Sequence, residues 1–232
     1  MRARVKAYLQ EERGNAALFM IGLLSIMMVL FVFVFNLSKI FAVKEEANTT
    51  AQQASLAATS VLYDQLDEAI EKYESREIIG VVDSHPESIE EKIEKKEIQL
   101  RSDAGYNDYS ENEIKLEAID IVLTEELRHG LGKDKLDDIL GEEIYQQTLP
   151  DMVSQAKSTI IQNDGNLTDA TLTIKDGQVF VHASNTMEGT SFKGFFQDIK
   201  EDLFQTSAGP KVDFIEELSN FQNKEVERFL DE

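Results

Sequence analysis

The feature that most constrains this chain is a stretch near its N-terminus, from Gly14 to Ser38, that contains no charged residue. Its central part, residues 16–35, reads AALFMIGLLSIMMVLFVFVF. A helix of that length spans about 30 Å, the thickness of the hydrocarbon core of a bilayer. A helix is also the single-segment structure that satisfies its own backbone hydrogen bonds in lipid. Since the run lacks the polar face of a buried core helix, it predicts a transmembrane helix over residues 14–38.

The residues flanking this run predict a retained anchor and its orientation. The run exceeds the apolar core of a usual cleaved signal, about 7–15 residues, and residues 38–42 offer no small-x-small cleavage site. Four basic residues precede the run and two follow it, which favours a cytoplasmic N-terminus over residues 1–13 and an external remainder. Arg13 and Lys39 should mark the membrane boundary, because burying either charge is expensive. We therefore expect a single-pass membrane protein whose N-terminus lies in the cytoplasm and whose C-terminal domain lies outside.

The charge of the chain is unevenly distributed. The formal net charge is −21, yet residues 1–44 hold six basic and two acidic side chains, which leaves 17 basic and 42 acidic side chains in residues 45–232. So acidic a surface repels nucleic acid, which is not expected as a partner. A solvated surface explains these carboxylates most simply. The absence of cysteine from the sequence excludes disulfides and thiolate metal sites.

The segment after the apolar run predicts a second helical stretch. No glycine or proline occurs from Ala42 to Ile79, and small or apolar residues recur at steps of three and four. The pattern predicts a stalk helix over residues 39–79 that continues the membrane helix. Alanines on one face allow a neighbour to approach closely, and that neighbour could be the protein's own domain or a partner. The residues of this face are Ala47, Ala51, Ala54, Ala58, Val61, Leu62, Leu66, Ala69 and Tyr73.

The remaining residues, 80–232, predict an acidic extracytoplasmic domain that is mostly helical. We expect a turn at Val82–Pro86, a loop over Ser102–Glu113, and two helices separated by Pro150. Aromatic residues at helical spacing predict further helices over Phe192–Phe204 and Val212–Leu230. The other expected helices cover residues 87–100, 114–131, 133–147 and 152–162.

One segment of this domain changes to a period of two. The β-rich runs 170–174 and 178–183 are joined by Lys175-Asp176-Gly177, a strong hairpin signal. A lone hairpin is unstable, so it should pack on a helix, such as the stalk helix, or on further strands. The expected fold class is therefore α+β, with a long transmembrane helix continuing into a stalk helix and a mostly helical domain containing a β-hairpin.

Few residues carry recognisable chemistry. The histidines His85, His129 and His182 accompany no catalytic signature, and the Ser154-x-x-Lys157 pair lacks the partner motifs of the serine enzymes that use it. We expect no enzyme and assign no catalytic, cofactor-binding or metal-ligating residue. Two oxygen-rich stretches raise calcium binding as an alternative, although neither has EF-hand spacing. They contain Asn163, Asp164, Asn166 and Asp169, and Asp103, Asn107, Asp108, Glu111 and Glu113.

The order of features around the apolar run resembles a known family. Glu12–Leu18 (ERGNAAL) opens the run, Asn36–Lys44 closes it with a short polar exit, and the alanine-rich Ala47–Ala58 follows. Over residues 10–62 this order resembles the TadE/TadG-like proteins of Flp (tight adherence) pilus systems. The resemblance implies a non-enzymatic accessory component, pilin-like or assembly-related, of a pilus or secretion apparatus, anchored in the bacterial cytoplasmic membrane. Its implied partners are the lipid bilayer and other apparatus proteins, met through the transmembrane and stalk helices.

The resemblance also implies a processing site and leaves an alternative open. Pilin-type precursors are cut after a glycine that follows basic residues, which points to Arg13, Gly14 and Asn15, although Phe19 stands where such precursors have Glu. The Asp-x-Ser-x-Ser run of the von Willebrand A-like domain of longer TadG proteins is absent from the sequence. The alternative function is a membrane-tethered binding or sensing module that captures a cation or basic ligand. A hydrolase using Asp/Glu catalysis is the third function considered.

Overall fold

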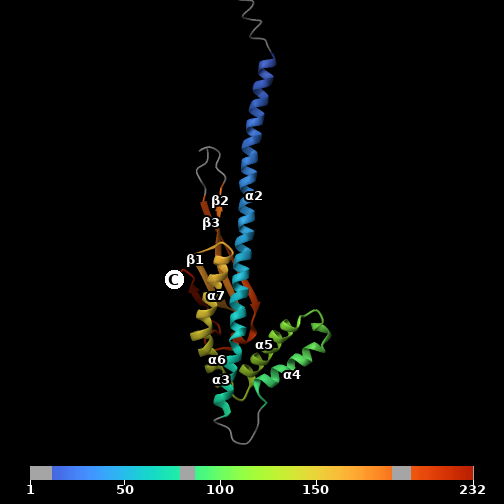
Figure 1. Cartoon of the computed structure of the whole chain (residues 1–232), viewed down its shortest axis with the longest axis vertical. Coiled ribbons are helices and arrows are strands. Elements are labelled where there is room, and N and C mark those ends of the chain that lie inside the picture. Colours follow the sequence, from blue (N-terminus) through green and yellow to red (C-terminus); the bar gives the residue numbers. More distant parts are fainter. Residues whose placement is uncertain (1–11, 79–86, 190–199, 232) are drawn as a thin grey trace, which may run out of the picture.

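A computed structural model of the chain shows one 53-residue helix, α2 (Glu12–Asp64), that extends beyond the rest of the molecule at its N-terminal end (Figure 1). The structure describes residues 12–78, 87–189 and 200–231. Gln65 interrupts the helix, and α3 (Leu66–Ile78) follows. The long helix predicted from the sequence is therefore present as two consecutive helices. The predicted turn at Val82–Pro86 lies outside the described residues.

Shorter helices surround the C-terminal part of α2 (Figure 1). Ser88 and Ser110 start two of them, since each hydroxyl accepts a hydrogen bond from the backbone N–H three residues later. Ser110 and Glu113 form a reciprocal capping box. The helices are α4 (Ile89–Arg101), the short 3-10 helix η1 (Ala104–Tyr106), α5 (Glu111–His129), α6 (Lys133–Glu143), the π-helix η2 (Ile144–Thr148), α7 (Leu149–Gln162) and α8 (Asp213–Glu217).

Pro150 does not separate two helices as predicted. It lies in the first turn of α7, directly after a π-helix in which the backbone N–H of Leu149 bonds the carbonyl oxygen of Ile144, five residues earlier. The ordinary hydrogen-bond ladder that a proline would interrupt is therefore already altered at this point. The five-residue π-helix η2 joins α6 to α7 directly. The helix break is thus replaced by a local widening of the helical turn.

A four-stranded antiparallel sheet with the order β3-β2-β1-β4 packs beside these helices. Its strands β1 and β2 form the predicted hairpin, and both are longer than the predicted runs. The two-residue turn between them has positive φ at both Asp176 (50°) and Gly177 (68°), which is the type I′ geometry that Asp-Gly favours. The strands are β1 (Gly165–Lys175), β2 (Gln178–Glu188), β3 (Lys200–Lys211) and β4 (Val226–Phe229).

The two aromatic helices predicted near the C-terminus are wrong where the structure describes them. Residues 200–204 of the first belong to β3, which pairs with β2, while residues 192–199 lie outside the described residues. Within the second, α8 covers only five residues, Asn223 adopts a left-handed conformation (φ 55°), and β4 follows. These segments form strands because pairing with neighbouring strands outweighs the weak helical preference that their aromatic spacing indicated.

The core lies between the sheet and the C-terminal half of α2, together with α7. Alternate sheet residues such as Leu172 and Val181 are fully buried on this side, as is the alanine face of α2 from Ala47 to Ala58. Gly209 of β3 permits the close approach, because a Cβ there would lie 2.7 Å from the Thr59 hydroxyl. The protein's own domain therefore covers the alanine face, and the fold is α+β as predicted.

Candidate functional site

The N-terminal part of α2 is the apolar surface that calls for a functional explanation. Every side chain from Ala16 to Phe31 is exposed, although most of them are large and apolar. Monomeric soluble proteins rarely expose so large a contiguous apolar area. By length and composition this helix is able to cross a membrane.

The hydroxyl groups in this part of α2 are satisfied within the helix. Ser25 donates to the carbonyl oxygen of Ile21 at 2.8 Å, and Ser38 donates to that of Val34 at 3.0 Å. Neither hydroxyl requires water as a partner, which suits an apolar surrounding in which an unpaired polar group costs several kcal/mol. The local chemistry is thus compatible with lipid along the segment.

Lys39 lies where the sheet begins to flank α2. Its ammonium donates to the carbonyl oxygen of Glu188, at the end of β2, at 3.4 Å, and lies 5.4 Å from the ring centroid of Phe35. On the N-terminal side of Lys39 the helix is mostly exposed, and on its C-terminal side burial begins at Ala47. The contact with Glu188 therefore lies close to the transition from the projecting helix to the packed domain.

The other predicted boundary and processing residues share the same helix. Arg13, Gly14 and Asn15 lie in the first turn of α2, and their side chains are outside the description. Arg13 and Lys39 are 26 positions apart, which corresponds to about 39 Å of helix. That length matches a hydrocarbon core of about 30 Å plus part of each headgroup layer.

A comparison with known protein families matches this part of the chain. Residues 14–61 fit a family described as putative Flp pilus-assembly TadE/G-like. No curated protein and no solved structure matches the chain. The match confirms the resemblance inferred for the N-terminal region, and residues 14–61 are called the TadE/G-like segment below.

The TadE/G-like segment covers both the exposed and the packed part of α2. It starts in the first turn of the helix, passes Lys39, and ends beyond Ala58, the last buried alanine of α2. The segment therefore contains the apolar surface and the helix face on which β2, β3 and α7 pack.

The oxygen-rich stretches considered for calcium have structural partners. Asp103 accepts the backbone N–H of Gly105 at 2.9 Å, and Asn166 donates to Thr186 and Asp202. Asp164 and Asp169 adopt positive φ angles where the chain enters and bends along β1. Within the described residues, no group of three or more potential ligand side chains (His, Cys, Asp or Glu) is arranged to bind a metal ion.

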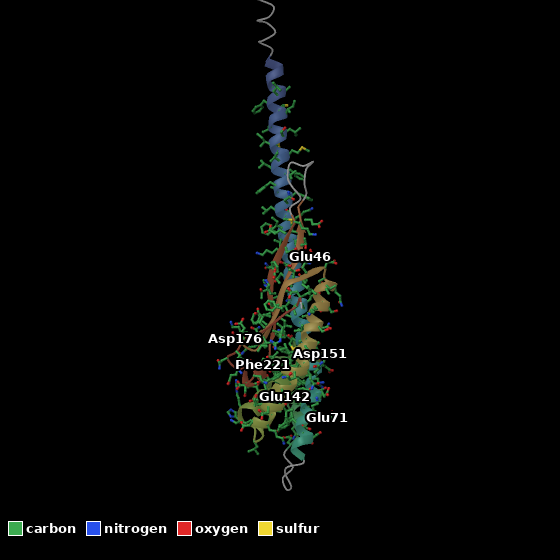
Figure 2. The ribbon with its side chains drawn as sticks, turned by 90° about the vertical axis from the view of Figure 1, so that its left-hand side faces the viewer. Glu46, Glu71, Glu142, Asp151, Asp176 and Phe221 are labelled. Atoms are coloured by element: carbon green, nitrogen blue, oxygen red, sulfur yellow. The ribbon has the colours of Figure 1, made fainter. Side chains whose placement is uncertain are left out.

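Several exposed carboxylates lie at different heights along the folded region. Figure 2 shows the labelled carboxylates spread from the upper to the lower part of the folded region. Each is solvent-exposed, as expected for a surface that keeps a domain soluble. The labelled carboxylates are Glu46, Glu71, Glu142, Asp151 and Asp176.

The residues considered for catalysis are separated in the fold. His129 ends α5, and Ser154 is exposed on α7. His182 lies on β2, where its ring stacks on Phe204 at 5.0 Å and its Nδ1 is 2.8 Å from the Thr206 hydroxyl. His85 lies outside the described residues. These positions give no positive indication of catalysis.

A buried carboxylate that the sequence analysis did not single out has a structural role. Asp120 of α5 accepts the backbone N–H groups of Asp213 and Phe214, at 3.0 and 2.9 Å. Burial raises the pKa of Asp120, and the two backbone hydrogen bonds oppose that rise. Tyr63 of α2 is partly buried, and burial, together with the charge of Asp120, raises its pKa. No sequence motif marked this pairing, because its partners are 93 and 94 positions away.

Proposed function

We propose that this protein is a non-enzymatic, membrane-anchored accessory component, pilin-like or assembly-related, of a Flp/Tad-type pilus or related secretion apparatus. The observation that carries the proposal is the coincidence of the TadE/G-like segment with the exposed apolar part of α2. A family match alone would not say which part of the chain carries the function. The exposed apolar helix supplies a physical reason for a membrane location.

In this proposal residues 14–38 cross the cytoplasmic membrane, residues 1–13 face the cytoplasm, and residues 80–232 form the external domain. Residues 39–79, the stalk, connect the membrane segment to this external domain. The basic flank favours this orientation, and the carboxylates of residues 45–232 favour water over an anionic lipid surface. Arg13 and Lys39 set the depth of the helix.

The mechanism is mechanical rather than chemical. Because α2 is one helix from Glu12 to Asp64, the membrane segment and the core of the domain are parts of the same rigid element. Lys39 adds a contact with the end of β2. A displacement or rotation of the membrane segment within an assembly is therefore passed directly to the external domain.

The proposal is tested by exchanging the anchor. In one variant, residues 16–35 are replaced by an unrelated single-span helix of equal length, which keeps membrane insertion but removes the apolar part of the TadE/G-like segment. Tagged full-length protein and the variant are purified from native membranes in mild detergent. We expect a secretion ATPase and Tad-type platform proteins to co-purify with the natural chain and to be lost with the variant. Their absence from both preparations would contradict the proposal.

A further inference from the structure

A solvent-facing cleft lies between the strand β4 and the π-helix η2, outside the TadE/G-like segment. Its volume is about 620 Å³, within the range of roughly 300–1,000 Å³ that is usual for ligand pockets. Tyr145 of η2 lines it and is 37% exposed. Such π-helical turns occur frequently at functional sites. The cleft is also lined by β4 and the residues before it, including Asn220, Lys224, Glu225, Glu227 and Arg228.

The cleft contains two cations that are bonded to neutral groups. Lys224 donates to the backbone carbonyl oxygen of Ser219 at 2.8 Å, and Arg228 donates to that of Glu227 at 2.9 Å. The guanidinium of Arg228 lies 5.2 Å from the ring centroid of Tyr145. Within the described residues neither cation has a carboxylate partner, although the chain carries a net charge of −21. The basic side chains that do pair with carboxylates are Lys72, Lys92, Lys95, Lys96, Arg101, Arg128, Lys175, Lys200 and Lys211.

The two carboxylates at the cleft do not neutralise these cations. Glu225 forms an ion pair with Lys175 of β1 at 3.3 Å. Glu227 is exposed and precedes Arg228 directly, and successive side chains of a strand point to opposite faces of the sheet. The side chain of Glu227 therefore leaves β4 on the side opposite to Arg228. The side of the cleft that holds Arg228 and Tyr145 is positive.

The free edge of β4 adds a backbone donor to the cleft. In the order β3-β2-β1-β4, the described strands leave one edge of β4 without a partner. The N–H of Leu230 donates to the carbonyl oxygen of Ala170 in β1 at 2.8 Å. Because alternate residues make the bonds of an antiparallel pair, the backbone groups of Arg228 also face β1, and those of Glu227 face the free edge. The bond from the Arg228 side chain to the Glu227 carbonyl oxygen agrees with this direction.

We propose that this cleft binds an extended peptide segment of a partner protein, and that the segment carries a carboxylate. The segment lies beside β4 as an added strand and accepts the N–H of Glu227. Its carboxylate accepts charge-assisted hydrogen bonds from Arg228 and Lys224. A strand edge next to two cations fits a peptide better than a free anion, because a free anion has no backbone for the edge to pair with.

The acidic character of the chain does not prevent this binding. Exposed charges farther away than about 8 Å are largely screened at physiological ionic strength, so the two nearby cations dominate at the cleft. The inference goes beyond the proposed function, since it adds a contact surface that depends neither on the membrane segment nor on the TadE/G-like segment.

NMR titration of the full-length protein in detergent micelles tests the proposal. The probe is the peptide acetyl-Thr-Val-Glu-Val-Thr-amide, and the matched control has Gln in place of its Glu. We expect the probe to shift the signals of the Glu227 N–H and the Arg228 Nε, and to bind at least about tenfold more tightly than the control. Equal affinities, or no shift at these two groups, would overturn the proposal. Glutarate that binds as tightly as the probe would show a site for isolated carboxylates and would overturn it as well.

Replacing one cation tests the charge contact. Arg228→Gln should weaken binding of the probe about tenfold or more, because the charge-assisted hydrogen bonds are lost. Arg101→Gln removes the same charge from an exposed position of α4 and should leave the affinity unchanged. If Arg228→Gln lowers the melting temperature, the exposed Lys224→Gln replaces it. An affinity that resists both cleft changes contradicts the proposal.

Two substitutions of Glu227 separate strand addition from simple attraction of charges. Glu227→Pro removes the N–H at the free edge, where proline is tolerated because that N–H makes no bond to β1. Glu227→Gln keeps the N–H, and both variants remove the same negative charge. Charge attraction alone predicts equal or tighter binding in both, whereas strand addition predicts that only Glu227→Pro binds more weakly, by about tenfold. With matching melting temperatures, equal affinities of the two variants would overturn the added strand.

Failure of this inference is distinguishable from failure of the proposed function. The peptide titration concerns residues 145–228 and uses no other protein of the apparatus. A negative titration contradicts the cleft alone. Absence of apparatus proteins from both anchor-exchange preparations contradicts the proposed function alone.

Discussion

Single residues stabilise this fold by joining segments far apart in the sequence. Asp120 is the most consequential, because one buried carboxylate accepts two backbone N–H groups at the start of α8. Arg128, on the same helix, pairs with Glu217 at 2.6 Å, at the other end of α8. The short helix α8 is therefore attached to α5 at both ends.

Replacing Asp120 tests the first of these attachments. Asp120→Ala leaves two backbone N–H groups without their acceptor, and the free energy of unfolding should fall by about 1–3 kcal/mol. Asp138→Ala removes the same charge from an exposed position of α6 and should change it by less than about 0.5 kcal/mol. Urea denaturation of both variants measures the difference. Equal midpoints would show that the Asp120 hydrogen bonds are dispensable.

The raised pKa of Tyr63 predicts a loss of stability at alkaline pH. Its pKa in the folded protein is raised by burial and by neighbouring carboxylates, while the unfolded chain ionises near pH 10. Above that pH the folded state binds more protons than the unfolded state, so the free energy of unfolding decreases as pH rises. Tyr63→Phe should remove this part of the decrease. Denaturation of both proteins at pH 8 and pH 11 provides the test, and equal pH dependences would contradict the assignment.

At the scale of elements, the close approach of α2 to the sheet depends on small residues. Gly209→Ala would place a Cβ 2.7 Å from the Thr59 hydroxyl and 3.4 Å from the Ser55 carbonyl oxygen. We expect β3 to shift and the free energy of unfolding to fall by about 1–3 kcal/mol. Gly105→Ala meets only ordinary contacts and is the matched control. Thermal melting of the two variants should separate them, and an unchanged Gly209→Ala protein would show that the packing tolerates a larger spacing.

The elements that the sequence predicted are those with local signals. The uncharged run marks α2, and Asp176-Gly177 marks the β1–β2 turn. The strands β3 and β4 were missed because their partners lie far away and their aromatic residues also fit a helical spacing. Pairing of Lys200 with Glu188 is a tertiary property that no local pattern encodes.

In the candidate site, too, the features with local sequence signals were predictable and the contacts between distant residues were not. The apolar segment, its resemblance to a known family and the alanine face were all readable from residues 10–62. The contact between Lys39 and Glu188 was not, because it joins residues 149 positions apart. Nor could the sequence decide what covers the alanine face, since alanine permits a neighbour without specifying it.

For the whole molecule, the proposed processing at Gly14 has a definite mass signature. Cleavage after Gly14 would yield a mature chain that begins at Asn15. The result is informative because Phe19 stands at the position where pilin-type precursors have Glu. Intact-mass analysis of protein purified from native membranes distinguishes the two forms. A chain that begins at Met1 would remove the processing proposal and leave the anchoring proposal intact.

The central claim is that α2 passes through the membrane and continues into the core of an external domain. Single cysteines in the otherwise cysteine-free chain test it through labelling of intact spheroplasts with a membrane-impermeant maleimide. We predict that Ser154→Cys is labelled directly, that Ala7→Cys is labelled only after permeabilisation, and that both proteins resist extraction by alkaline carbonate. Protection of Ser154→Cys in intact spheroplasts, or release of the protein by carbonate, would contradict the claim.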